Sequence, residues 1–64
     1  MYRLYTFNPQ TVMTEGYLHR GEFASEQDCN DFAFENNFAF YRIELISFWG
    51  CLLIFETPWE TVAS

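Results

Sequence analysis

Hydrophobic and polar residues alternate at the start of the chain, in the pattern that a half-buried β-strand produces. The first alternating segment covers residues 2–7 and is rich in aromatic residues, which favour strands. Residues 8–10 (Asn-Pro-Gln) interrupt it, because Asn and Pro are turn formers. A second strand is predicted from about residue 12 or 14 to residue 23, although Gly16 and Gly21 weaken it.

The pattern changes to helical spacing after Ser25. Ser25 is followed three residues later by Asp28, which is the arrangement of a helix N-cap with an acid in the first turn. A helix is therefore predicted over residues 26–36, ending where an Asn-Asn pair can adopt a left-handed conformation. Phe34 points away from its apolar face. That face consists of Cys29, Phe32, Ala33 and Asn36.

The strongest strand pattern covers residues 38–48. A Trp-Gly turn and a returning strand over residues 51–57 complete a hairpin, which Pro58 ends. The last six residues, 59–64, are predicted to be a tail that only Trp59 anchors. One expected face of the hairpin carries Tyr41, Ile43, Leu45, Cys51, Leu53 and Phe55. The other carries Phe40, Ile46, Leu52 and Ile54.

The order strand, strand, helix, strand, strand predicts an α+β fold. One helix is expected to pack on one face of an antiparallel sheet of about four strands (ββαββ), in a single domain over residues 1–64. So short a helix cannot cover both apolar faces of the hairpin, and exposed apolar surface usually marks an interaction site. The uncovered face is therefore expected to be a dimer or partner surface, formed by Phe40, Ile46, Leu52 and Ile54.

The composition is that of a small globular domain with a high density of aromatic side chains. Half of the residues are hydrophobic, and the chain contains eight Phe, four Tyr and two Trp. Disorder requires low hydrophobicity, so a folded domain is expected. A domain of this length buries only about 60% of its unfolded surface. We therefore expect either a dense core or help from a second copy or a partner.

Charge argues against direct binding of nucleic acid or membrane. Nine Asp and Glu residues oppose three Arg residues, and the formal net charge is −6. Phosphates and anionic membrane surfaces repel such a protein, whereas a basic protein surface complements it. The stretch between Arg20 and Arg42 contains no basic residue and five carboxylates: Glu22, Glu26, Asp28, Asp31 and Glu35. They indicate either a solvated helix face or the footprint of a basic partner.

The sequence holds no set of residues typical of catalysis or metal binding. His19 is the single histidine, and no residues at zinc-ligand or catalytic spacing accompany it. Cys29 and Cys51 do not form a Cys-x-x-Cys motif and fit as small core residues, although a bond between them stays open. There is no glycine-rich phosphate loop and no calcium loop. We therefore expect no enzyme, no cofactor and no bound metal.

The chain is expected to be cytoplasmic. Its start lacks the pattern of a signal peptide, and the longest apolar run, residues 52–55, is too short to span a membrane. Two cysteines do not make a disulfide scaffold, which favours a reducing compartment.

The acidic helix of residues 25–36 is flanked by strands that end at Phe7, Phe23, Arg42 and Phe55. In this overall design the chain resembles small phage-encoded inhibitor proteins, including anti-CRISPR proteins. The resemblance implies a single acidic α+β domain that blocks a host nucleic-acid enzyme by occupying its binding surface.

The sequence thus predicts a non-catalytic, acidic domain that inhibits or regulates a larger protein by occupying a basic, nucleic-acid-binding surface. Trp49 is expected to be an apolar anchor, or alternatively to fold back over the small core. The expected partner-binding residues are Glu22, Glu26, Asp28, Asp31, Phe34, Glu35 and Trp49. The alternative is a structural or assembly module that forms a homodimer through the apolar hairpin face, with the acidic helix serving only solubility.

Overall fold

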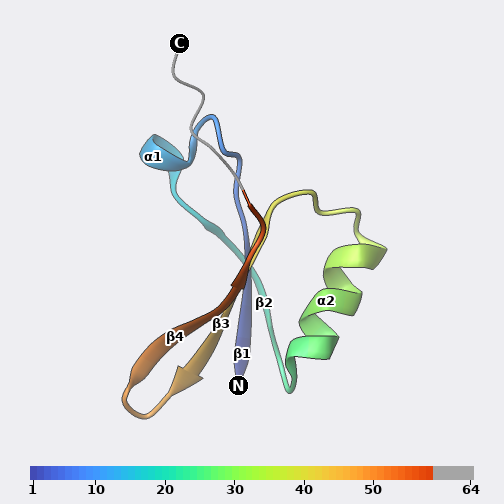
Figure 1. Cartoon of the computed structure of the whole chain (residues 1–64), viewed down its shortest axis with the longest axis vertical. Coiled ribbons are helices and arrows are strands. Elements are labelled where there is room, and N and C mark those ends of the chain that lie inside the picture. The colour runs from blue at the N-terminus through green and yellow to red at the C-terminus, as the bar shows by residue number, and fades with distance from the viewer. Residues whose placement is uncertain (59–64) are drawn as a thin grey trace.

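A computed structural model describes residues 1–58 and has an α+β fold (Figure 1). The sheet has four antiparallel strands in the order β2-β1-β3-β4, which confirms the predicted fold class. Neither helix within residues 1–58 has the length and apolar character needed to cross a membrane. The elements are β1 (Tyr2–Thr6), α1 (Val12–Glu15), β2 (Leu18–Phe23), α2 (Glu26–Glu35), β3 (Tyr41–Ser47) and β4 (Gly50–Glu56). The expected tail and its anchor Trp59 lie outside the described residues.

The segment before β2 is helical rather than extended. The carbonyl of Thr11 accepts backbone hydrogen bonds from Thr14 and Glu15, at 3.0 and 2.7 Å. The Thr14 hydroxyl donates to the same carbonyl at 3.1 Å. Gly16, with φ of 72°, then redirects the chain into β2. The prediction of a strand from residue 12 or 14 was wrong because these local hydrogen bonds offer the backbone an alternative to sheet pairing.

Helix α2 begins at the predicted residue, Glu26, and ends at Glu35, one residue before the predicted end. Ser25 is extended, and its hydroxyl oxygen accepts a hydrogen bond from the backbone N–H of Asp28 at 3.1 Å. At the other end, the backbone N–H and the side-chain amide of Asn36 both donate to the carbonyl of Phe32, at 3.1 and 2.8 Å. Asn37 follows in the left-handed region, with φ of 57°. Both ends are therefore satisfied by neighbouring residues in the sequence.

The core lies between α2 and the middle of the sheet. Its fully buried members are Leu4 and Ile43, which are register partners on β1 and β3, and Cys29 and Ala33 on α2. Within the described part of the chain, α2 contacts β1, β2 and β3 but not β4. Figure 1 accordingly places the loop between β3 and β4 at the lower left and α2 on the opposite side. The helix thus leaves one side of the sheet, and the outer strand β4, uncovered.

The register of the β3–β4 hairpin differs from the prediction. Ser47 and Gly50 are register partners, so residues 48–49 form a two-residue loop, one position earlier than the predicted Trp-Gly turn. Gly50 has φ of 135°, which glycine adopts readily. A slip of one residue moves every side chain of a strand to the other face. Ile54 has no register partner and forms a bulge. The bulge shifts the alternation of side chains between the two faces by one more residue, so that Phe55 lies on the same face as its partner Ile43.

The predicted division of the hairpin into two faces was therefore wrong. Leu52 lies beside Leu45 on the face toward α2, whereas Cys51 lies beside Ile46 on the opposite face, called here the open face. The face toward α2 carries Tyr41, Ile43, Leu45, Leu52 and Phe55. The open face carries Arg42, Glu44, Ile46, Cys51, Leu53 and Glu56.

Candidate partner-binding surface

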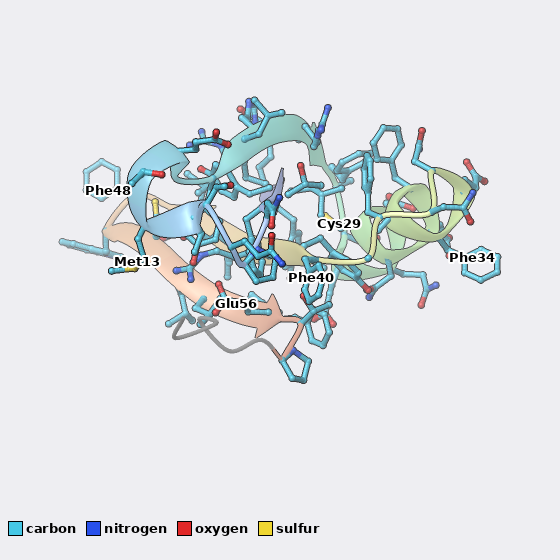
Figure 2. All side chains as sticks on the ribbon, turned by 90° about the horizontal axis from the view of Figure 1, so that it is seen from above. Met13, Cys29, Phe34, Phe40, Phe48 and Glu56 are labelled. Carbon is cyan, nitrogen blue, oxygen red and sulfur yellow. The ribbon has the colours of Figure 1, made fainter. Side chains whose placement is uncertain are left out.

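Helix α2 has one face against the sheet and one face in solvent. Cys29 and Ala33 are buried, and the Phe32 ring packs 5.2 Å from that of Phe23. Phe34 points the other way and is 85% exposed. In Figure 2 it lies at the outer margin of the molecule, directed away from the sheet. A large aromatic side chain on the solvent face of a helix contributes little to the fold, so it marks a candidate contact residue.

Carboxylates share this exposed surface of α2 with Phe34. They are Glu26, Asp28, Asp31 and Glu35, called here the α2 carboxylates, and all four residues are exposed. None of the ion pairs within residues 1–58 involves them. Asp31 accepts a hydrogen bond from Nε2 of Gln27 at 2.8 Å, and this donor is a neutral amide. The exposed side of α2 is therefore an aromatic ring in an anionic surface.

Helix stability explains the positions of only two of the four α2 carboxylates. Glu26 and Asp28 lie in the first turn, where the helix dipole favours negative charge. Asp31 and Glu35 stand four residues apart and repel each other. Glu35 also lies at the C-terminal end, where the dipole disfavours an acid, and the last turn has no basic residue. Helix stability therefore does not account for the repulsion between Asp31 and Glu35 or for the position of Glu35 at the C-terminal end.

Two of the arginines lie on the open face of the sheet and are engaged there. Nη2 of Arg3 donates to Oε1 of Glu22 at 3.4 Å. Nε of Arg42 donates to Oε2 of Glu44, and its Nη1 donates to Oε1 of Glu56, both at 2.9 Å. These ion pairs neutralise carboxylates of the strands. They do not involve the α2 carboxylates.

Arg20 lines an open groove of about 720 Å³ between the loop after β1 and residues 37–40. Its Nε donates to Oγ1 of Thr6 at 2.8 Å, and its guanidinium lies 5.2 Å from the centre of the Phe38 ring. The fold therefore holds this cation against the sheet. None of the ion pairs described for the chain joins it to α2.

The structure brings most of the predicted partner-binding residues together on α2, but Glu22 is not among them. Glu22 is on β2, and its register partner is Arg3. Arg3 precedes Leu4, which faces α2, so both Arg3 and Glu22 face the open side. The expectation that Glu22 belongs with the helix was wrong, because strand pairing places it on the other side of the sheet.

Trp49 also lies apart from the α2 surface. It is 91% exposed in the loop between β3 and β4, and its ring packs 5.2 Å from that of Phe48. Figure 2 shows Phe48 and Phe34 at opposite ends of the molecule. Trp49 therefore cannot share one contiguous surface with Phe34, and its high exposure also excludes the alternative in which it folds back over the core.

Phe48 is 93% exposed but was not among the predicted contact residues. It was placed inside a strand, whereas it is the first residue of the two-residue loop. The available signal was the pair of adjacent aromatics directly before a glycine, because a tight turn at that position must expose both rings. Phe48 and Trp49 are called here the hairpin tip.

The residues predicted to form one dimer face are dispersed. Phe40 precedes β3 and packs 5.8 Å from the ring of Phe7. Ile54 packs against the core from its bulge. Ile46 and Leu52 lie on opposite faces of the sheet. The four do not make a single surface, and the physical reason is the register slip at the hairpin loop.

The cysteines occupy different environments and are not bonded to each other. Cys29 is buried on the face of α2 that packs against the sheet, and burial raises the pKa of its thiol, as do the charges of Asp28 and Glu26. Cys51 is exposed on β4, which corrects the interpretation of Cys51 as a core residue. Because α2 does not contact β4 within the described residues, the two thiols are not brought together.

His19 is exposed on β2, an edge strand of the sheet, and its ring lies 5.6 Å from that of Tyr5. In the part of the chain that the structure describes, no group of three or more His, Cys, Asp or Glu residues is arranged to hold a metal ion. The α2 surface is therefore the strongest candidate site, and what it offers chemically is a fixed array of negative charge around an apolar anchor.

No family model, curated protein or solved structure matches this chain.

Proposed function

We propose that this chain is a non-catalytic binding domain that inhibits or regulates a larger protein by covering a basic, nucleic-acid-binding surface with α2. The observation that carries the proposal is Phe34, 85% exposed among carboxylates that none of the described ion pairs neutralises. Aromatic anchors surrounded by polar contacts are typical of binding hot spots. The role is the one that the resemblance to small phage-encoded inhibitors, including anti-CRISPR proteins, implies.

The proposed mechanism is competition for arginine and lysine side chains. The α2 carboxylates take the place of phosphates on the partner, and Phe34 enters an apolar recess between the basic residues. Opposite charges accelerate the encounter of two proteins, and salt screens this attraction over a Debye length of about 10 Å at 0.1 M. Binding should therefore weaken as the salt concentration rises. We place the protein in the cytoplasm, a setting that suits its two unbonded cysteines.

The first experiment compares the capture of a target from an extract of the native host by matched variants. Phe34→Ala should reduce affinity for the captured protein by about 30-fold, corresponding to the loss of an aromatic hot spot of about 2 kcal/mol. Met13→Ala is its control, because Met13 is 80% exposed but lies on α1. Equal loss in both variants would exclude α2 as the binding surface.

The second experiment tests the charge. The double variant Asp31→Asn/Glu35→Gln should slow association with the purified target by about tenfold at low salt. It should also reduce the dependence of that rate on ionic strength. Glu15→Gln, which neutralises an exposed carboxylate on α1, is the control. The target's nucleic acid should compete with the domain, and simultaneous binding of both would contradict the proposed mechanism.

A further inference from the structure

Among residues 1–58, β4 is an edge strand, and no other strand pairs with its outer side. The backbone N–H of Ile46 on β3 donates to the carbonyl of Met1 at 2.8 Å, so Ile46 directs its backbone groups away from β4. Its register partner on β4 is Cys51. Residues of such an antiparallel pair turn their backbone groups away from each other, so those of Cys51 point outward. Leu53, two residues on and opposite Glu44, has the same orientation.

This edge lacks the charged residues that usually protect an edge strand. The other edge of the sheet, β2, carries Arg20 and Glu22 and has a register shift against β1. In β4, residues 50–55 (Gly-Cys-Leu-Leu-Ile-Phe) contain no charge. The bulge at Ile54 limits the regular part of the edge to residues 50–53. A regular, uncharged edge of this kind is a template for pairing with another strand.

Apolar side chains accompany the unpaired edge. Leu52 is 62% exposed on the α2 side of the sheet, and Leu53 is 46% exposed on the open face. The hairpin tip extends the same strand. At roughly 150–250 Å² per aromatic side chain, Phe48 and Trp49 could contribute on the order of 400 Å² to an interface. That is about half of the roughly 800 Å² per partner that a stable interface needs, and the two leucines with the β4 backbone add to it.

We propose that β4 pairs antiparallel with β4 of a second copy of this chain, joining the two sheets into one. The outward backbone groups of Cys51 and Leu53 determine the register between the two β4 strands. Cys51 of each copy lies opposite Leu53 of the other and exchanges backbone hydrogen bonds with it. Leu52 then lies opposite Leu52 on the twofold axis. This register uses every outward backbone group of residues 50–53 and is self-complementary, as a twofold interface requires.

Charge restricts a contact between two copies to an uncharged part of the chain. Two chains with a net charge of −6 repel each other, so a self-contact must form where the chain carries no charge. Residues 50–55 are such a segment. The next residue, Glu56, is held by Arg42 at 2.9 Å. Because α2 does not contact β4 in the described residues, the dimer leaves both acidic helices exposed. The dimer is thus independent of the function proposed for α2.

Sedimentation equilibrium of the full chain at micromolar concentrations tests the proposal. The wild type should sediment as a dimer. Leu53→Lys should weaken dimerisation by at least about tenfold, equivalent to about 1.4 kcal/mol, because a charge then lies on the paired edge. The lysine can pair with Glu44, its register neighbour within the chain, which preserves the fold. Met13→Lys is the matched control, with the same charge change at an exposed site on α1, and should leave the dimer intact.

Disulfide trapping tests the register. In a Cys51→Ser background, Leu52→Cys places two thiols opposite each other on the twofold axis. A non-hydrogen-bonded antiparallel pair has Cα atoms about 4.5 Å apart, which is within the range of a disulfide, about 4.4–6.8 Å. Oxidation should therefore yield a covalent dimer. Met13→Cys in the same background is the control and should remain monomeric on a denaturing gel.

Each alternative occupant gives a distinct result that overturns the proposal. A monomer whose Cys51 and Leu53 amides exchange rapidly with solvent leaves the edge to a strand of a different protein. A monomer in which these amides are protected assigns the edge to another part of the same chain. A dimer that survives Leu53→Lys, or in which Leu52→Cys does not cross-link, uses another surface.

Discussion

Phe32 and Phe34 lie two residues apart on α2 and point to opposite sides of it. The ring of Phe32 contacts those of Phe23 and Phe38, at 5.2 and 6.0 Å, whereas Phe34 is 85% exposed. The two phenylalanines therefore have different roles in the helix. One joins α2 to the sheet, and the other is available to a partner.

This division predicts opposite responses to the same substitution. Phe32→Leu should lower the free energy of unfolding by about 1–2 kcal/mol, because it removes part of a packed ring. Phe34→Leu should change it by less than about 0.5 kcal/mol, as surface substitutions do. Urea denaturation followed by circular dichroism measures both. A large loss in Phe34→Leu would assign Phe34 to the fold and remove the main support for the proposed function.

The N-cap of α2 gives a second prediction. Ser25→Ala removes the hydroxyl that accepts the N–H of Asp28 and should destabilise the domain by about 1 kcal/mol. Ser25→Asn keeps a capping oxygen and should restore most of the loss. The same denaturation measurement distinguishes the variants. Equal stability of the alanine and asparagine variants would mean that the cap contributes nothing beyond the packing of the helix.

The sequence predicted α2 well because its signals are local. The cap at Ser25, the spacing of Cys29 and Ala33 and the stop at Asn37 all act within a few residues along the chain. For the same reason, the carboxylates within α2 were correctly expected to lie on one short helix. Glu22 was misplaced because only pairing between strands decides which face of a sheet a residue occupies.

The two faces of the β3–β4 hairpin, by contrast, could not be predicted from local signals. Its loop contains two aromatic residues and no Asn or Gly, so the preferred residues of a two-residue turn do not indicate its position. The bulge at Ile54 has no sequence signature of its own. Each of these features shifts the alternation by one residue, and the assignment of Ile46 and Leu52 to one face failed as a result. The α1 turn was missed for a related reason, since Thr11 and Thr14 support strands and local turns alike.

The charges of α2 give a third prediction, which separates stability from binding. Glu35→Gln should raise the free energy of unfolding by about 0.3–0.5 kcal/mol, because it removes repulsion from Asp31 and an unfavourable charge at the C-terminal end. Glu26→Gln, at the N-terminal end, should lower it by a similar amount. Both substitutions should weaken binding to the target. A lower free energy of unfolding in Glu35→Gln would show instead that Glu35 stabilises the fold.

The two thiols should differ strongly in reactivity. Cys51 is exposed, and in the monomeric chain it should react with a thiol reagent at the rate of a free cysteine. Cys29 is buried and has a raised pKa, so it requires unfolding to react. An unfolding free energy of about 4 kcal/mol, reasonable for a domain of this size, corresponds to a reaction on the order of a thousandfold slower.

Mass spectrometry of the alkylated protein identifies which cysteine reacts first. The variant Cys51→Ser should lose the fast phase and retain the slow one. Fast labelling of Cys29 in that variant would place it outside the core.

Tyr17 gives a prediction for alkaline pH. Its hydroxyl donates to Oε1 of Glu56 at 3.0 Å. Partial burial, followed by this hydrogen bond and the charge of Glu56, raises the pKa of Tyr17 above its ordinary value of 10.0, although Arg42 opposes the shift. The folded state therefore holds the phenolic proton more tightly than the unfolded state does. This contribution to stability is complete below pH 10 and is lost as the pH rises through the raised pKa of the folded protein.

The measurement is the free energy of unfolding between neutral and strongly alkaline pH, compared between the wild type and Tyr17→Phe. Tyr17→Phe lacks the titrating group, so its stability should fall less steeply above pH 10 than that of the wild type. Absorbance of the phenolate should show the same difference, because the variant lacks the late-titrating tyrosine. Parallel stability curves would mean that ionisation of Tyr17 is the same in both states, and that its contact with Glu56 does not hold the proton.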